Sequence, residues 1–472
     1  MIQVRTNCIS AWKIVATLIV GCFSVSAVVA QNAAEPSPPA TVKMVAKVPP
    51  AELYKPSVMP DRIVLTWSGD PAATQSVTWR TSPEVTRGLA EITVADAAPA
   101  LQAKSRQVVA VTQTLTTEQT TAHCHSAVFE GLTAKTKYAY RVGDGTNWSE
   151  WFHFTTASAE SEPFSFIYFG DAQNDVRSLW SRVIREAFSD APKAKFMIHA
   201  GDLINRAEND WEWGEWFAAG GWMNAMIPSV PVPGNHEMVK VDLLTGRLSA
   251  HWRPQFTLPE NGPPGLEETC YTFVCQGVRI IGLNSNEKIM DQTPWLEKVL
   301  QENKEKWVIC TFHHPIFSTG KNRDNLMLRN AWKPILDKYR VDLVLQGHDH
   351  TYGRTGLDTP VATANLATGV SAADMFSGTV YVVSVSGPKM YDVQRQPFMV
   401  RNAENTQLYQ IIHINGDQLH YEAFTATGEL YDAFTLYKQA GGVNRLTDEI
   451  PKTPERLKPP VEEKDSEKKK AS

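Results

Sequence analysis

Five apolar segments of this chain end abruptly in short polar motifs. In chain order the motifs are Gly170-Asp171, Gly201-Asp202, Gly234-Asn235-His236-Glu237, His313-His314-Pro315 and Gly347-His348-Asp349-His350. Strands that are buried between two layers deliver the loops at their carboxyl ends to the same edge of a sheet. We therefore expect side chains scattered between positions 171 and 350 to converge. The glycine in four of the motifs suits the sharp turn that each loop needs.

The donor atoms of these motifs indicate a metal site. Two carboxylates, one carboxamide and three imidazoles suit borderline cations such as Fe, Zn or Mn, whereas a hard cation such as calcium binds imidazole poorly. A single Gly-Asp after a strand is usually only a turn, and a single histidine at a strand end is usually a surface residue. The ordered set of five motifs therefore carries the prediction, and no motif carries it alone.

The chain is long enough for more than one folded domain. Its 472 residues are 43% hydrophobic and 21% charged, which excludes a mostly disordered chain and a polytopic membrane protein. Short alternating runs over residues 61–157 predict an antiparallel β-sandwich. Apolar strands alternate with helical stretches over residues 163–438 and predict a second domain. Residues 31–60 are predicted to be a linker, and residues 439–472 a charged, disordered tail.

The first 30 residues have the pattern of a secretory signal peptide. Arg5 and Lys13 precede an apolar segment, Ile14 to Ala30, which ends in small residues before Gln31. This pattern predicts a secreted, periplasmic or cell-surface protein without a transmembrane helix in the mature chain. Two alternatives stay open: retention of the segment as a membrane anchor, and a lipid anchor at Cys22, which ends a stretch that resembles a lipobox.

Charge and cysteine content limit the partners and the chemistry. The net charge of −5 provides no strong basic field, so we predict no nucleic-acid partner and expect a local site to hold any anionic substrate. No pattern in the sequence predicts an oligomeric state. Of the four cysteines outside the first 30 residues, Cys270 and Cys275 are close enough in sequence for a local disulfide, and Cys310 is expected to be a buried thiol.

The ordered motifs resemble the signature of the calcineurin-like metallophosphoesterases. With a preceding sandwich that resembles a fibronectin type III domain, the arrangement is similar to that of purple acid phosphatases. The resemblance covers residues 61–438 and is most specific over 164–355. It implies an α+β fold, in which the antiparallel sandwich is followed by a four-layer α/β/β/α domain with two mixed sheets. It also implies a secreted, acid-phosphatase-like enzyme that hydrolyses small phosphomonoesters with a hydroxide bridging two divalent or trivalent metal ions.

The resemblance assigns roles to seven side chains. The first metal ion is bound by Asp171 and His350, the second by Asn235, His313 and His348, and Asp202 bridges the two ions. His313 is preferred to His314 as the ligand, because the family's ligand lies two residues before the proline. His236 is expected to contact the substrate and to protonate the leaving alkoxide.

Two positions depart from the family pattern. Purple acid phosphatases carry Gly-Asp-x-x-Tyr, but Asn205 stands here in place of the tyrosine that gives those enzymes their colour. We therefore expect a colourless protein whose first metal ion need not be ferric. Gln173 stands where many other metallophosphoesterases have a histidine. Either Gln173 or Asn205 supplies an amide oxygen to the metal, or both only form hydrogen bonds to the ligands; the sequence leaves these alternatives open.

Five further side chains are candidates for contacts with the substrate. They are Glu237, His314, Lys321, Arg323 and Tyr352. Surface solvation or packing is the competing interpretation for each of them. Two alternative functions also stay open, because monoester and diester hydrolases share these ligands: a phosphodiesterase that uses the same site, and a non-catalytic surface binding protein with a vestigial metal site.

Overall fold

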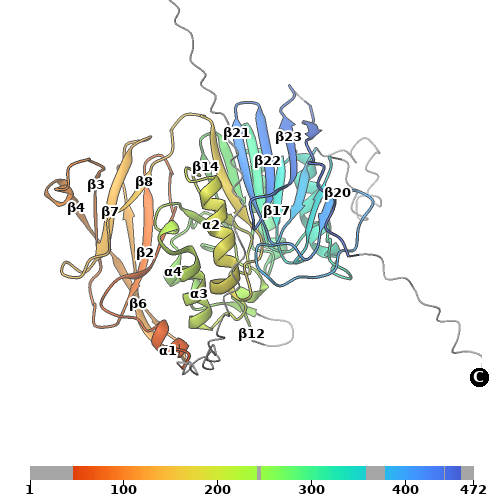
Figure 1. Cartoon of the computed structure of the whole chain (residues 1–472). Coiled ribbons are helices and arrows are strands. Elements are labelled where there is room, and N and C mark those ends of the chain that lie inside the picture. The colour runs from red at the N-terminus through yellow and green to blue at the C-terminus, as the bar shows by residue number, and fades with distance from the viewer. Residues whose placement is uncertain (1–45, 242–245, 358–377, 441, 459–472) are drawn as a thin grey trace, which may run out of the picture. The chain divides into compact units, whose positions relative to one another are not determined.

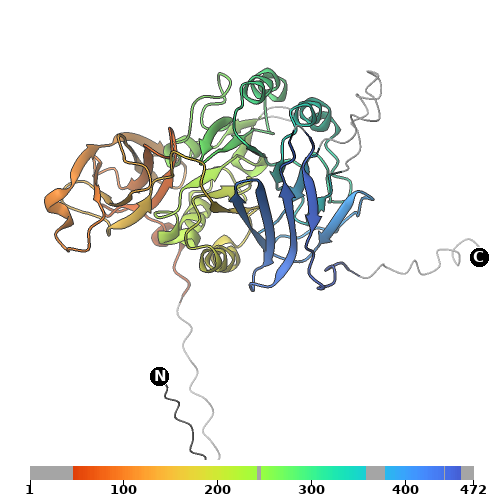
Figure 2. The ribbon, with the colours of Figure 1, turned by 90° about the horizontal axis from the view of Figure 1, so that it is seen from above.

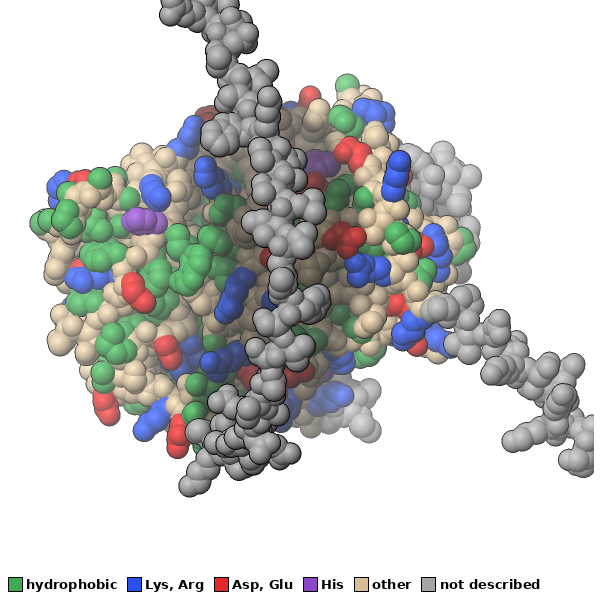
Figure 3. Space-filling view, in the orientation of Figure 1, with side chains coloured by type: hydrophobic (Ala, Val, Ile, Leu, Met, Phe, Trp, Pro, Cys, Tyr) green, Lys and Arg blue, Asp and Glu red, His purple; other side chains and the backbone are tan. Residues whose placement is uncertain are grey.

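The computed structural model describes residues 46–241, 246–357, 378–440 and 442–458. The predicted signal peptide, including the alternative lipid anchor at Cys22, lies outside the described residues. Residues 46–60, the described part of the predicted linker, include one short helix, α1 (Pro50–Leu53). Among the described residues, no helix combines the length and the apolar character needed to cross a membrane. On the face drawn in Figure 3, Lys and Arg side chains are interspersed with Asp and Glu.

The N-terminal domain is a sandwich of two antiparallel sheets (Figure 1). One sheet has the order β1 (Asp61–Thr66), β2 (Gln75–Thr81), β6 (Thr121–Phe129) and β5 (Val111–Thr116). The other has the order β4 (Arg106–Val109), β3 (Leu89–Val94), β7 (Lys137–Gly143) and β8 (Phe152–Thr155), with a 3₁₀ turn at Leu101–Lys104. The alternating pattern of the strands directs aromatic residues such as Trp79, Phe129 and Tyr140 into the core between the sheets.

The second domain contains two mixed, seven-stranded sheets. The first has the order β11 (Ser229–Pro231), β10 (Met197–His199), β9 (Phe164–Phe169), β21 (Leu408–Asn415), β22 (Gln418–Thr425), β23 (Leu430–Tyr437) and β24 (Arg445–Asp448). The second has the order β14 (Tyr271–Cys275), β15 (Val278–Gly282), β16 (Trp307–Thr311), β17 (Leu343–Gln346), β19 (Val380–Val383), β18 (Tyr352–Thr355) and β20 (Met399–Ala403). A separate hairpin joins β12 (Met238–Lys240) to β13 (Gly246–Leu248).

Helices cover the outer sides of the paired sheets (Figure 2). On the first sheet, a helical turn at Val176–Trp180 leads into α2 (Ser181–Asp190), which packs with α3 (Asp210–Gly220); Gly221–Met223 and α4 (Trp252–Gln255) follow. On the second sheet, α5 (Ile289–Gln301) and α6 (Leu326–Lys338) bury leucine and tryptophan side chains against the strands. Between the sheets lies one large core, in which the Tyr168 hydroxyl donates to the carbonyl of Gln346. The predicted α+β fold with its four-layer domain is confirmed.

The pairing of the strands explains why distant motifs meet. β9, β10 and β11 run parallel, with His199 in register with Phe169 and Pro231. In the other sheet β16 and β17 are also parallel, with Thr311 opposite Leu345. The loops that follow these five strands therefore leave the two sheets on the same side, at the carboxyl ends of the strands; this side is called the loop edge below.

The C-terminal segment differs from the prediction of a tail that is disordered from residue 439. β24 pairs antiparallel with β23, with Leu446 opposite Leu436. Farther along, Glu455 accepts a hydrogen bond from the backbone of Asn402 at 2.8 Å. The prediction is wrong for these residues, because an open sheet edge supplies backbone hydrogen bonds that composition does not reveal. Residues 459–472 lie outside the described part of the chain.

The cysteines do not form the local disulfide that the sequence allowed. Cys124, Cys270, Cys275 and Cys310 are all free and buried. Burial raises the pKa of the Cys124 and Cys275 thiols to about 12. These residues therefore act as small apolar core residues, as expected for Cys310.

A buried ionic cluster joins the sandwich to the second domain. Arg62 of β1 donates to both carboxylate oxygens of Asp210, each at 2.8 Å, and Arg80 of β2 lies 3.3 Å from the same carboxylate. His251 Nε2 lies 3.3 Å from Asp210 Oδ1. Burial alone would raise the pKa of Asp210, but His251 and Arg62 hold it well below its usual value. Asp210 is thus an ionised carboxylate that the chain's own cations neutralise.

Candidate metal centre

The five loops bring the predicted ligands together in two adjacent clusters. Asp171 follows β9, Asp202 follows β10, Asn235 begins the 3₁₀ turn Asn235–Glu237 after β11, His313 follows β16, and His348 and His350 follow β17. Donor atoms of Asp171, Asp202 and His350 lie within 4.8 Å of one another. The same holds for His313, His314 and His348. The convergence expected from the order of the motifs is therefore present.

The first cluster contains buried acceptor atoms that face one another. His350 Nδ1 lies 2.8 Å from the carbonyl of Lys389, so this nitrogen carries the proton and Nε2 keeps a lone pair. This Nε2 lies 3.2 Å from Asp171 Oδ2 and 3.3 Å from Gln173 Nε2, which can donate to it. Asp171 Oδ2 and Gln173 Oε1 are buried and have no hydrogen-bond partner among the residues that the structure describes. A cation beside Asp171 Oδ2 would satisfy this unpaired acceptor.

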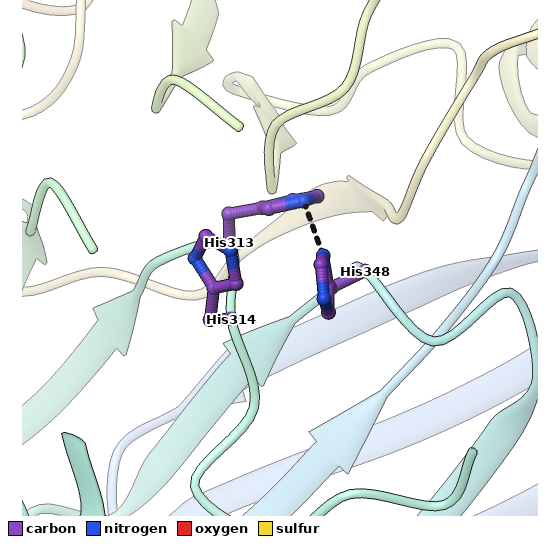
Figure 4. Close-up of side chains that lie close together, drawn as sticks. All are labelled: His313, His314 and His348. Carbon is purple, nitrogen blue, oxygen red and sulfur yellow. Dashed lines mark hydrogen bonds between the residues drawn. The ribbon is translucent and has the colours of Figure 1, made fainter. Parts of the chain in front are cut away.

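The second cluster is built from imidazoles (Figure 4). His313 Nδ1 lies 2.9 Å from the carbonyl of Ala200, which leaves Nε2 as the nitrogen that faces the cluster. This Nε2 is 3.1 Å from His348 Nδ1, 3.1 Å from Asn235 Oδ1 and 3.2 Å from Asp202 Oδ2. His348 Nδ1 is in turn 2.9 Å from Asn235 Oδ1. Two imidazoles, a carboxamide and a carboxylate fit a borderline transition-metal ion.

Asp202 lies between the two clusters. Its Oδ2 atom accepts a hydrogen bond from Gln173 Nε2 at 2.7 Å on one side and approaches His313 on the other. The backbone of Asp202 has a positive φ of 52°. A Cβ atom on Gly234 would lie 2.2 Å from Asp202 Oδ1, so this close approach of two loops requires glycine. The local sequence therefore holds one carboxylate within reach of both clusters.

The electrostatics of the clusters favour a bound cation. Burial, reinforced by the neighbouring Asp202 carboxylate, raises the pKa of Asp171 to about 8. Burial acts to lower the pKa of His313, but Asp202 and Asp171 together raise it to about 9. Protons thus balance these charges in the isolated chain. A divalent or trivalent ion would replace those protons and stabilise ionised carboxylates beside neutral imidazoles.

Glu237 holds the loops of the site together. It is fully buried, and its carboxylate accepts backbone hydrogen bonds from Asp202, Leu203 and Gly234 at 2.7–2.8 Å. Burial raises the pKa of Glu237 to about 7. The expectation that Glu237 contacts the substrate is wrong, because all its hydrogen-bonding capacity is directed at the backbone. The sequence signal for this role is an acidic residue directly after the ligand motif, which also fits an exposed contact.

His236 is the member of the motif that stays partly open to solvent. Its side chain is 26% exposed, and Nε2 lies 3.9 Å from Asp202 Oδ2. Its Nδ1 atom lies 2.5 Å from the carbonyl of Asn205. The backbone N–H of Asn205 donates to Glu212 Oε2 at 2.9 Å. Asn205 therefore acts through its backbone as a support for His236, whereas Gln173 inserts its side chain into the first cluster.

Two candidate substrate contacts lie beside the second cluster. His314 Nδ1 lies 2.8 Å from the Ser285 hydroxyl, and its ring centroid is 4.3 Å from that of His348. Arg323 donates to Asp349 Oδ1 at 3.1 Å and to the carbonyl of His348 at 3.0 Å. Burial lowers the pKa of His314 to about 3, so this ring is neutral. Both side chains remain candidates for contact with a phosphate ester.

The two other candidate substrate contacts lie elsewhere. Tyr352 is fully buried and donates to Asp432 Oδ2 at 2.6 Å, inside the core between the sheets. The expectation that Tyr352 lines the site is wrong, because the side chain of this strand residue faces away from the loop edge. Lys321 is exposed on the loop that also carries Arg323.

The sequence interpretation overlooked the loop after β19. The carbonyl of Lys389 orients His350, and the ring of Tyr391 lies 4.6 Å from the His350 ring. The backbone of Gly387 donates to the carbonyl of Asp171 at 2.6 Å. The signal was available, because Ser386-Gly387-Pro388 follows an apolar strand as the five motifs do, but it contains no metal-binding side chain.

Comparison with known protein families agrees with this geometry. Residues 164–352 match the calcineurin-like phosphoesterase family. This match covers the part of the chain that carries the five motifs and the two donor clusters. Residues 60–156 match the N-terminal domain of purple acid phosphatases. The two matches, in this order, agree with the resemblance to the two-domain architecture of the purple acid phosphatases.

Individual relatives are distant. An uncharacterized protein of Mycobacterium tuberculosis is 27% identical, with 66% of each chain covered. The Fe(3+)-Zn(2+) purple acid phosphatase 12 of Arabidopsis thaliana is 26% identical over 50% of this chain and 53% of its own length. The chain therefore spans between half and two thirds of the length of these relatives. The structure of the purple acid phosphatase PPD1 from yellow lupin seeds shares the fold, with a TM-score of 0.66, 17% identity and coverage of 80% and 74% of the two chains.

Proposed function

We propose that this protein is a dinuclear metal-dependent phosphohydrolase that acts on small phosphomonoesters in the manner of an acid phosphatase. The observation that carries the proposal is the pair of donor clusters that share Asp202. Each cluster contains converging lone pairs, and the first includes buried acceptors that no described donor satisfies. A buried carboxylate oxygen without a donor destabilises the fold, so the unpaired Asp171 Oδ2 supports a site that binds an ion and not a vestigial one.

We assign the ligands from the side chains that converge in the two clusters. Asp171, Gln173, Asp202 and His350 would hold the first ion, and Asp202, Asn235, His313 and His348 the second. Gln173 is chosen over Asn205 because its amide is buried beside Asp202 and His350, and rotation of the amide presents its oxygen. The name of the Arabidopsis relative supports an iron–zinc pair. Since no tyrosine occupies position 205, we expect no tyrosinate absorption band.

The residues around the ions then have defined tasks. Two bound ions would supply a nucleophilic hydroxide and neutralise the charge of the phosphoryl group. Glu237 and Gly234 hold Asp202 at the shared position. His236, fixed through Asn205, presents Nε2 to donate a proton to the leaving oxygen. Arg323 adds a positive charge beside His348, where it can contact a phosphate oxygen.

The role of His236 can be separated from metal binding. His236→Ala should retain both metal ions, because the imidazole is not among the converging donors. It should lower kcat by about 10²–10⁴-fold, the usual share of general-acid catalysis. Metal content by mass spectrometry, measured beside phosphate release, checks this. Loss of metal in the variant would instead make His236 a ligand.

The test of the proposed function is reconstitution followed by assay. The purified protein is loaded with iron, zinc or manganese, and the bound ions are counted by mass spectrometry. Hydrolysis of p-nitrophenyl phosphate is then compared with that of its bis ester. We expect about two ions per chain and faster hydrolysis of the monoester, both abolished by a chelator. Faster hydrolysis of the bis ester would make the protein a phosphodiesterase, and fewer than about one ion would favour a non-catalytic binding protein.

We further propose that the protein is exported, on the basis of the signal-peptide pattern of the first 30 residues. Sequencing the N-terminus of the protein recovered from its native host tests this. A mature chain that begins at Gln31 supports the proposal, and a lipid-modified Cys22 would establish the alternative anchor. An intact N-terminus would contradict both.

A further inference from the structure

A pocket of about 750 Å³ opens beside the second cluster. Asn235 and His314 form its inner end, so the pocket is continuous with the candidate metal centre. Its walls come from the β12–β13 hairpin, the loop of residues 285–288 and the first turns of α5 and α6. A volume of this size accommodates a small-molecule ligand as well as the phosphate beside it.

The outer walls of the pocket are apolar and rich in methionine. Met238 from β12, Met290 from α5 and Met327 from α6 line it, together with Ile289 and Leu328. Met290 and Met327 are 66% and 69% exposed, so packing in the core does not explain them. Methionine side chains are flexible and polarizable, and they adapt to apolar ligands of irregular shape. Three of the chain's 12 methionines therefore meet at one opening next to the metal ligands.

The charges around the pocket are balanced. Lys240 and Lys288 line it beside Glu287 and Asp291. Two cations and two anions create no net field that would draw in a charged group. At the inner end, by contrast, the Ser285 hydroxyl and His314 offer polar atoms close to the metal ligands. The pocket is thus polar where the phosphate would lie and apolar farther out.

We infer that this methionine pocket binds the alcohol part of the substrate and selects phosphate esters of uncharged, largely apolar alcohols or phenols. The inference rests on the proposed phosphohydrolase function and adds the substrate class. An ester bound with its phosphate at the two clusters places its carbon chain along Met238, Met290 and Met327. A sugar phosphate or a nucleoside polyphosphate would leave hydroxyl or phosphate groups unpaired against these side chains.

A series of n-alkyl phosphates tests the inference, because the reactivity of the leaving group changes little from ethyl to hexyl. With the metal-loaded enzyme, kcat/KM should rise by about two- to fourfold for each added methylene. In the double variant Met290→Ala/Met327→Ala this rise should be lost, which lowers kcat/KM for hexyl phosphate relative to ethyl phosphate by at least about 16-fold, the product of four twofold steps. Hydrolysis of methyl phosphate should stay within about twofold of the original, because methyl phosphate does not reach these side chains.

Met59→Ala is the matched control, because Met59 is also exposed, at 48%, but lies outside the pocket. It should leave the dependence on chain length unchanged. Hydrolysis of every ester without a dependence on chain length would overturn the inference and leave the proposed function intact. A dependence that survives in the double variant would also overturn it. Failure to hydrolyse any ester, methyl phosphate included, would overturn the proposed function and the inference together.

Discussion

Asp210 and Asp171 are both buried aspartates, yet their surroundings differ in kind. Asp210 is 1% exposed, and two arginines bond or approach its carboxylate. Asp171 is 0% exposed; its Oδ1 accepts one backbone N–H from His348, and its Oδ2 has no donor among the described residues. The pKa of Asp210 is held low by His251 and Arg62 in spite of burial, whereas burial raises that of Asp171 to about 8.

The two aspartates show two different roles for a buried carboxylate: one forms ion pairs within the protein, and the other is available to an external cation. At the domain junction the chain supplies its own counter-ions, so the cluster holds the sandwich against α3 and requires nothing else. At the loop edge the carboxylates of Asp171 and Asp202 are balanced by protons, among them the proton that His313 holds. Such an arrangement is costly unless an ion from outside completes it. The comparison therefore supports the proposal that the loop edge binds metal ions, on grounds separate from the sequence motifs.

The largest expected effect follows from removing the carboxylate that the two clusters share. Asp202→Ala should lower phosphate release by at least about 10³-fold, because several kcal/mol of charge stabilisation depend on the ions it holds. The variant should also bind fewer ions after reconstitution. Activity assays and metal analysis on the same sample check both effects. Full metal content with full activity would show that Asp202 does not bridge the clusters.

Mutation of the ionic cluster between the two domains should change the stability of the protein and leave its hydrolytic activity unchanged. Asp210→Asn leaves Arg62 buried without its anionic partner, whereas Arg80 keeps its ion pair with Asp61; the loss should lower the free energy of unfolding by about 3–5 kcal/mol. Urea denaturation of the metal-loaded protein measures this. At temperatures where the variant is folded, it should retain its metal ions and its activity. Unchanged stability would mean that the arginines find other partners and that the cluster does not fasten the domains.

The contribution of Asp210 should also depend on pH. Its folded pKa is lower than that of an unfolded aspartate, which is about 3.9. The stabilisation is therefore complete above about pH 4 and is lost as the pH falls through the folded pKa. The difference in stability between the original protein and Asp210→Asn should shrink progressively below about pH 4. A difference that stays constant in acid would show that the carboxylate is not ionised in the folded protein.

Much of the fold and most of the site could be predicted, because both depend on local patterns. Apolar strands that end in Gly-Asp or Gly-His fix which loops meet, so Asp171, Asp202 and His350 were expected together. Roles that depend on the direction of a side chain could not be read in this way. Tyr352 directly follows a ligand loop but faces the core, and Glu237 directly follows His236 but binds backbone. Sequence proximity to a motif does not determine which face a residue presents.

Contacts made by the backbone were equally hidden. The carbonyl of Lys389 orients His350, and the carbonyl of Asn205 orients His236. The type of side chain at positions 389 and 205 does not predict this role. The same limit explains the C-terminal segment, where β24 forms through backbone pairing despite a charged composition. Backbone atoms are common to all residues, so a single sequence contains no signal for them.

The smallest predicted effect is that of Asp171→Asn on the stability of the metal-free protein, and it tests the comparison with Asp210 directly. In the metal-free protein, Asp171→Asn should change the free energy of unfolding by less than about 1 kcal/mol, in contrast to Asp210→Asn. The amide oxygen keeps the hydrogen bond from the backbone of His348. The amide nitrogen can donate to His350 Nε2, whereas Oδ2 of the aspartate cannot. After reconstitution, the same variant should lose affinity for the first ion and most of its activity. Denaturation curves with and without metal measure the change in stability and the loss of metal affinity, and an assay of phosphate release measures the loss of activity. The opposite result is that Asp171→Asn destabilises the metal-free chain as strongly as Asp210→Asn does. That result would show that the Asp171 carboxylate has stabilising partners inside the protein, and it would contradict the proposal that this site requires a bound cation.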